Sequence, residues 1–172
     1  MNFAIAIAIV LLLGALTLVS YVDRLYTEIG RFLSREFQDN LNAFELKVEP
    51  KLGVSRNRAA LSMAILTQLI TASIALLLGY AVFRDQDWSG HEILEIILSL
   101  ILIVIVFNRF LPFVFFSRTK GQWLARWTLL LRILIYVVLP VTLVLGFLQS
   151  VAALTRNIQR SSLRPTLKQW TR

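Results

Sequence analysis

The 172-residue chain contains no cysteine, one histidine (His91) and only 16% charged residues. Without cysteine there is no disulfide framework, no thiolate metal site and no cysteine nucleophile. A single histidine argues against a histidine-based zinc site and against a Ser-His-Asp triad. Because a soluble domain has about 25% charged residues, the low charge also excludes an ordinary soluble enzyme. We therefore expect no enzymatic activity and no bound cofactor.

Hydrophobic residues make up 57% of the chain, and the mean hydropathy is +0.70. Three segments are apolar and long enough to cross about 30 Å of hydrocarbon as helices. We expect an all-α, polytopic helical membrane protein built on these spans. They are 3–22, 59–83 and 92–116.

Lysine and arginine are distributed unevenly among the polar segments, and this asymmetry predicts the orientation. Segment 23–58 has seven of them, 84–91 has one, 117–126 has three, and 155–172 has five. The first three counts place the N-terminus outside, with 23–58 and 117–126 in the cytoplasm. Segment 23–58 also has apolar residues at helical spacing, which predicts an amphipathic helix, and Pro50 and Gly53 interrupt that pattern.

Segment 127–154 decides the number of crossings. It is apolar over 28 residues but contains Arg132 and Pro140. If it crossed the membrane, the strongly basic tail would lie outside, against the positive-inside rule. We therefore expect three transmembrane helices plus a kinked juxtamembrane or re-entrant helix and a cytoplasmic C-terminus. The alternative is four transmembrane helices, since the segment is long enough to span a bilayer.

The formal net charge is +8. The basic residues flank apolar segments, where they hold a protein against anionic headgroups, so we expect the lipid bilayer as the partner and no nucleic acid. Residues 161–172 form a basic cytoplasmic tail. The tryptophans and basic residues expected at the lipid interface are Trp88, Trp123, Trp127, Arg156, Arg160, Arg164 and Lys168.

Polar side chains gather on one face of the second span. Thr67, Gln68 and Thr71 share this face, which continues through Ala75 to Gly79. Small and polar residues let another helix approach closely and form hydrogen bonds across the contact. The face therefore indicates either helix packing or the polar wall of an ion path.

The third span ends in the stretch FNRFLPFVFF, where Asn108 and Arg109 interrupt an apolar run. With a helix that begins near Glu92, Asn108 lies about 24 Å along the axis, towards the far interface. Arg109 is then within reach of headgroups. Pro112 removes a backbone hydrogen bond from this part of the helix.

These elements follow one another in an order that resembles the transmembrane domain of the CNNM/CorC family, often labelled hemolysin-like. The shared features include a proline near the inner end of the third span and a long apolar juxtamembrane helix. The stretches YVDRLYTEIGRFLSREFQDN, VEPKLGVSRNRAALSMAILTQL and FNRFLPFVFFSRTKGQWLARW carry the resemblance. It covers residues 1–160 and points to a divergent bacterial branch. It implies a homodimer in the bacterial inner membrane that transports magnesium, with sodium coupling proposed for the family.

The family's third span carries a Gly-Glu-x-x-Pro motif in which the glutamate helps to hold the cation. The matching residues here are Asn108, Arg109 and Pro112, so the proline is kept and the carboxylate is replaced by a guanidinium. Asparagines of the family's second span correspond to Thr67 and Gln68, and a serine of the first span corresponds to Ser20. The resemblance thus implies that the ion-binding residues are Ser20, Thr67, Gln68 and Asn108, with Asp23 nearby.

Two functions agree with these residues. The first is a magnesium-transport domain with a degenerate cation site. The second is a non-transporting membrane scaffold, or an accessory subunit of a larger membrane complex. This second function explains the arginine at position 109, because a guanidinium opposes cation binding. Typical family members continue into a pair of cytoplasmic CBS domains, and neither domain lies within the 172 residues.

Overall fold

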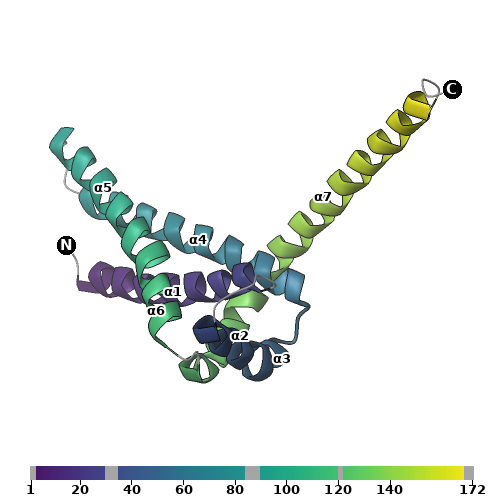
Figure 1. Cartoon of the computed structure of the whole chain (residues 1–172). Helices are drawn as coiled ribbons and strands as arrows, with labels where there is room; N and C mark the ends of the chain where they lie inside the picture. The colour runs from purple at the N-terminus through teal and green to yellow at the C-terminus, as the bar shows by residue number, and fades with distance from the viewer. Residues whose placement is uncertain (1–2, 30–34, 84–89, 120–121, 169–172) are drawn as a thin grey trace.

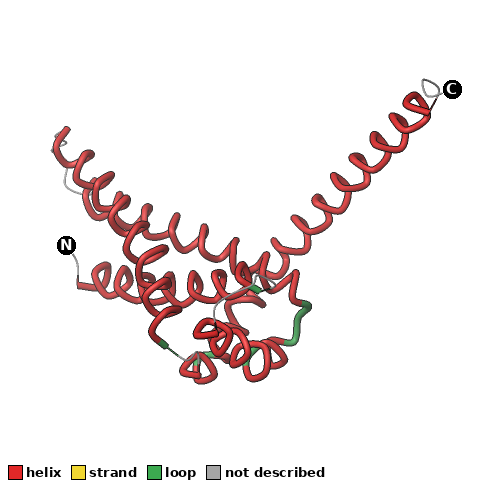
Figure 2. The backbone as a smooth tube through the Cα atoms, viewed as in Figure 1, coloured by secondary structure: helices red, strands yellow, loops and turns green. Residues whose placement is uncertain are grey.

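The computed structural model describes residues 3–29, 35–83, 90–119 and 122–168, and within these ranges every regular element is a helix (Figures 1 and 2). The predicted all-α helical membrane protein is confirmed. Four helical stretches are long and apolar enough to cross a membrane. They are Phe3–Glu28, Arg56–Phe83, Ile93–Arg118 and Thr128–Leu148.

The first two spans lie side by side (Figure 1). Helix α1 (Phe3–Glu28) extends almost two turns beyond the predicted segment 3–22, and its last turns bury Leu25 and Tyr26. Helix α4 (Arg56–Phe83) matches the predicted second span. We call the end of the bundle where α1 ends and α4 begins the inner end.

The polar segment between these spans folds over the inner end as α2 (Arg35–Lys47) and the one-turn α3 (Glu49–Leu52). Gly53 ends α3 with φ of 71°, a left-handed conformation that favours glycine. Pro50 lies in the first turn of α3, where its missing N–H costs no helical hydrogen bond. The predicted break in the helical pattern at Pro50 and Gly53 is therefore confirmed.

The third span is not a uniform α-helix. It consists of α5 (Gly90–Ile103), the π-helical segment η1 (Val104–Phe110) and α6 (Leu111–Arg118). The Leu111 N–H donates to the Val106 carbonyl, five residues back, as in a π-helix. Pro112 follows at once, in the first turn of α6, and has no N–H to close an α-helical ring onto Asn108.

The short 3-10 helix η2 (Gln122–Arg126) leads into α7 (Thr128–Lys168). Helix α7 is longer than the predicted segment 127–154 and continues without a break through Pro140. The predicted kink at this proline stays a prediction. Figure 1 shows its later part leaving the bundle rather than following α1 and α4.

Helix α7 crosses the base of α4. The hydroxyl oxygens of Ser62 and Thr142 form a buried hydrogen bond of 2.9 Å. By Thr142, α7 has run about 21 Å from Thr128, whereas Ser62 lies only about 9 Å into α4. Figure 1 shows α7 running at a wide angle to α4 rather than alongside it, although Thr128–Leu148 is also long and apolar enough to cross a membrane.

Most of the buried core lies at this inner end. Tyr26 of α1 and Phe44 of α2 meet edge to face, with ring centroids 5.1 Å apart. By contrast, Ile97, Leu98 and Ile101 of α5 expose half or more of their surface. Apolar surface of this extent is stable in lipid or against another protein. The largest fully buried side chains are Tyr21, Phe44, Leu16, Leu25, Leu52, Met63, Ile74, Leu124, Leu131 and Ile135.

Candidate functional site

A polar cavity of about 320 Å³ lies among the first three spans, towards the inner end. It contains all four residues that the sequence analysis selected as ion ligands. The π-helical segment η1 forms one of its walls, and π-helical segments are frequent at functional sites. The lining comprises Ser20, Asp23, Arg24, Thr27 and Glu28 of α1, Ala64, Thr67 and Gln68 of α4, and Asn108, Arg109 and Pro112 of the third span.

The first and third spans are joined inside the cavity by a hydrogen bond. The Ser20 hydroxyl donates to Oδ1 of Asn108 over 2.9 Å. Ser20 is buried and Asn108 is half-buried, so water does not replace this bond easily. The bond fixes the position of η1 against α1.

The hydroxyl groups of the cavity use their protons within the protein. Ser20 donates to Asn108, Thr67 donates to the Met63 carbonyl over 3.0 Å, and Thr27 donates to the Asp23 carbonyl over 2.9 Å. A hydroxyl that has donated its proton still carries lone pairs on oxygen. The cavity therefore offers oxygen atoms as acceptors, which is the chemistry that a hard cation requires.

Charges of both signs line the cavity. Asp23 and Glu28 are acidic, and Arg24 and Arg109 are basic. The Arg109 charge acts on the Asp23 carboxylate across the cavity. The Arg24 guanidinium instead lies over the ring of Phe113, with 5.0 Å to the centroid, and is held there by a cation–π interaction.

The carboxylates alone do not make a metal site. Among the residues that the structure describes, no group of three or more His, Cys, Asp or Glu side chains is placed to hold a metal ion. A cation in this cavity would therefore depend on hydroxyl, amide and water oxygens together with Asp23 or Glu28.

Three cavity residues of α1 were not predicted from the sequence, because the first span was expected to end at residue 22, and Ala64 of α4 was not predicted either. Arg24, Thr27 and Glu28 follow Ser20 by four, seven and eight residues. This spacing places all of them on one face of a helix. Once α1 is known to continue to Glu28, this helical spacing is enough to predict that the three residues face the same side as Ser20.

The aromatic residues expected at the lipid interface have different surroundings. Trp123 is half-buried against Tyr21, with ring centroids 5.3 Å apart, and its indole N–H donates to the Thr119 hydroxyl over 3.2 Å. Trp127 is 48% exposed. Trp88 lies outside the described residues. The basic residues Arg156, Arg160, Arg164 and Lys168 belong to α7.

Comparisons with protein-family models, curated proteins and solved structures returned no match to this chain. The cavity and the chemistry of its side chains are therefore the observations that bear on function.

Proposed function

We propose that this chain is a membrane-embedded magnesium-transport domain of the CNNM/CorC type. The observation that carries the proposal is the cavity in which α1, α4 and the third span each present polar oxygens to one space. Ser20, Thr67, Gln68 and Asn108 come from three separate helices, yet all four line it. Helix packing alone does not require a polar hollow of this size among apolar spans.

The size and chemistry of the cavity suit a hydrated divalent cation. Mg²⁺ keeps several of its waters and binds proteins through one or two carboxylates. Six waters at about 30 Å³ each occupy roughly 180 Å³, which is less than the 320 Å³ of the cavity. Asp23 supplies the carboxylate in place of the family's glutamate, and the neighbouring hydroxyl and amide oxygens accept from the bound waters.

Arg109 makes this site degenerate. Its guanidinium is a positive charge close to Asp23, so it competes with the ion for the same carboxylate. Its side chain is exposed, and a long arginine side chain can extend towards headgroups. In our proposal the ion enters when Arg109 moves away from Asp23, so the transport rate is low.

The proposed assembly is a homodimer in the bacterial inner membrane, with the N-terminus outside and the C-terminus in the cytoplasm. The excess of basic residues in 23–58 and 117–126 supports this orientation. The wide angle between α7 and α4, which meet through Ser62 and Thr142, supports three crossings and a juxtamembrane α7.

A second function is favoured by one observation. The lining of the cavity holds two acidic side chains, Asp23 and Glu28, and two basic ones, Arg24 and Arg109, so their formal charges already balance and the cavity needs no cation to compensate them. This agrees with a non-transporting scaffold or with an accessory subunit of a larger membrane complex.

Magnesium flux into proteoliposomes separates the two functions. The purified protein is reconstituted into liposomes that enclose a magnesium-sensitive dye, and uptake is measured with and without a sodium gradient. Liposomes without protein serve as the control. Transport predicts dye signal above that of empty liposomes. Folded, dimeric protein that gives no signal in either condition would reject transport and leave the scaffold function.

A further inference from the structure

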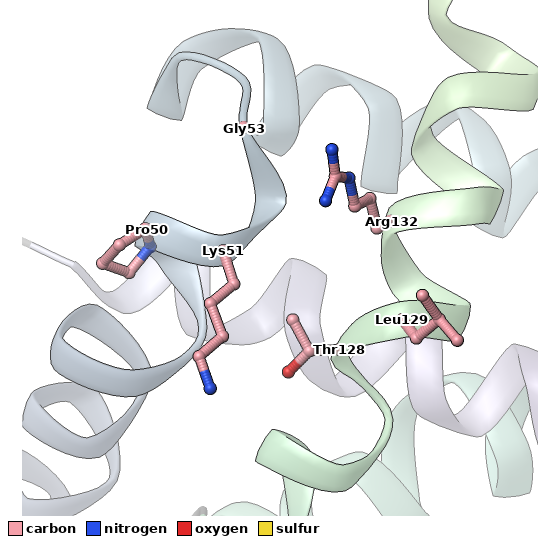
Figure 3. Close-up of a pocket in the computed structure, with 6 residues that line it drawn as sticks. All are labelled: Pro50, Lys51, Gly53, Thr128, Leu129 and Arg132. Carbon is pink, nitrogen blue, oxygen red and sulfur yellow. The ribbon is translucent and has the colours of Figure 1, made fainter.

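A second cavity, of about 500 Å³, lies at the inner end between α3 and the beginning of α7 (Figure 3). Two basic side chains line it, Lys51 from α3 and Arg132 from α7. Figure 3 shows Lys51 on one side of this space and Arg132 on the other; the Lys51 ammonium points down towards the level of the Thr128 hydroxyl, and the Arg132 guanidinium lies at the upper end. No Asp or Glu belongs to the described part of its lining.

Neither basic side chain forms an ion pair with a described residue. The acids nearest in sequence are already engaged, because Arg56 binds Glu49 at 2.7 Å and Glu45 at 2.9 Å. The charges of Lys51 and Arg132 therefore remain available to an anion. The cavity also lies against the first turn of α7, where the helix dipole adds a partial positive charge.

The cavity continues along one exposed, mostly apolar face of α7. A second hollow, of about 560 Å³, shares Leu129 and Arg132 with the first and adds Ile133, Tyr136 and Val137. Ile133 and Val137 are more than half exposed. The basic cavity and this apolar face of α7 therefore meet at Arg132, whose guanidinium lies 5.7 Å from the Tyr136 ring centroid.

We propose that this surface binds an anionic phospholipid of the inner leaflet. Lys51 and Arg132 contact the phosphate, and the acyl chains lie along Ile133 and Val137. Basic pockets between helices at the cytoplasmic side of a membrane bind anionic headgroups in this manner. The lipid would fix α7 along the inner interface, whether or not the polar cavity among the spans transports an ion.

Free phosphate does not explain the apolar half of this surface. Leu129, Ile133 and Val137 expose hydrophobic area directly beside the basic cavity. Hydrocarbon chains cover such area favourably, whereas a small hydrated anion leaves it in water. Because the basic cavity and the exposed apolar residues lie side by side, the surface favours a phospholipid over free phosphate.

Tryptophan quenching by brominated lipids tests the proposal. The full-length protein is placed in phosphatidylcholine vesicles that contain increasing amounts of brominated phosphatidylglycerol or brominated phosphatidylcholine. Trp127 immediately precedes the cavity residue Thr128, and Trp127→Phe identifies its share of the signal. We expect phosphatidylglycerol to quench Trp127 at about 25-fold lower mole fraction than phosphatidylcholine does, which is about fivefold for each of the two basic side chains.

The variant Lys51→Gln/Arg132→Gln should lose this preference, because each basic side chain near an anionic surface contributes roughly fivefold. The control Arg58→Gln/Arg126→Gln removes the same charge from exposed inner-end residues that do not line the cavity and should keep the preference. An equal loss in both double variants would overturn the proposal in favour of diffuse surface charge.

Two further results in the unmodified protein would also overturn it, and they do not depend on the folding of a variant. The first is equal quenching by the two brominated lipids. The second is relief of phosphatidylglycerol quenching by millimolar inorganic phosphate at constant ionic strength, which would identify a site for free phosphate instead.

Discussion

Ser20 in α1 donates a hydrogen bond of 2.9 Å to Oδ1 of Asn108, which lies 88 residues later in the π-helical segment of the third span. The two residues join two of the three walls of the polar cavity, which α1, α4 and the third span form. Because the proton of Ser20 is used in this bond, its oxygen faces the cavity as an acceptor. The same bond therefore positions η1 and prepares an oxygen for a cation.

Replacing Ser20 tests this double role. We expect Ser20→Ala to lower magnesium flux about tenfold and to lower the free energy of unfolding by about 1 kcal/mol, the usual contribution of one hydrogen bond. Ser73→Ala is the control, since Ser73 is exposed and donates only to the Leu69 carbonyl of its own helix. Flux assays and thermal unfolding in detergent measure the two effects. Equal flux in both variants would place Ser20 outside the ion path.

The Arg109→Gln substitution should raise magnesium flux several-fold. It removes the positive charge that competes for Asp23 and keeps a polar, though shorter, side chain. Arg118→Gln removes an equal charge from the exposed end of α6, away from the cavity, and should leave flux unchanged. If Arg109→Gln unfolds the protein or leaves flux unchanged, Arg109 has a structural or lipid-facing role instead.

Asn40 attaches the polar helix α2 to the third span. Its side-chain amide donates to the Phe116 carbonyl over 2.6 Å, and the residue is 2% exposed. We expect Asn40→Ala to reduce the free energy of unfolding by about 1–2 kcal/mol, because a buried hydrogen bond is lost. Asn42→Ala, on the exposed side of the same helix, should have almost no effect. Hydrogen exchange of α2 should accelerate in the first variant only, and equal exchange in both would show that this bond does not hold α2.

Single cysteines test the proposed path of α7, since the chain has none of its own. Ser117→Cys lies in the segment expected in the cytoplasm, and Ser161→Cys lies in the tail beyond the apolar part of α7. A membrane-impermeant maleimide added to sealed vesicles should label both positions from the same side. Labelling from opposite sides would establish α7 as a fourth crossing.

Hydropathy predicted the first three helical spans, and the family resemblance named four residues that line the cavity. Hydropathy and length identify the spans, because a bilayer of fixed thickness permits few alternatives. The resemblance to a transporter family selected Ser20 and Asn108, and the structure places them in hydrogen-bond contact. Gly53 was recognisable as a break because glycine readily adopts a positive φ.

Other features depend on tertiary contacts that no local pattern contains. The π-helical register around Asn108 accompanies the hydrogen bond from Ser20 of α1, and the sequence showed only that Pro112 disturbs the helix. Thr27 and Glu28 were missed because the charged residues after Val22 resemble the end of a span. Helix α7 continues to Lys168, beyond the apolar segment that defined its predicted end, and hydropathy reports burial in lipid rather than helix length.

The most direct test of the central claim is magnesium flux through the unmodified protein and through Asp23→Asn, compared in the same proteoliposome preparation. The substitution removes the carboxylate from the proposed site and changes little else in shape. The account predicts measurable flux for the unmodified protein and at least a tenfold loss for Asp23→Asn, with both proteins folded and dimeric. Equal flux in the two proteins, or none in either, would contradict a cation path through this cavity.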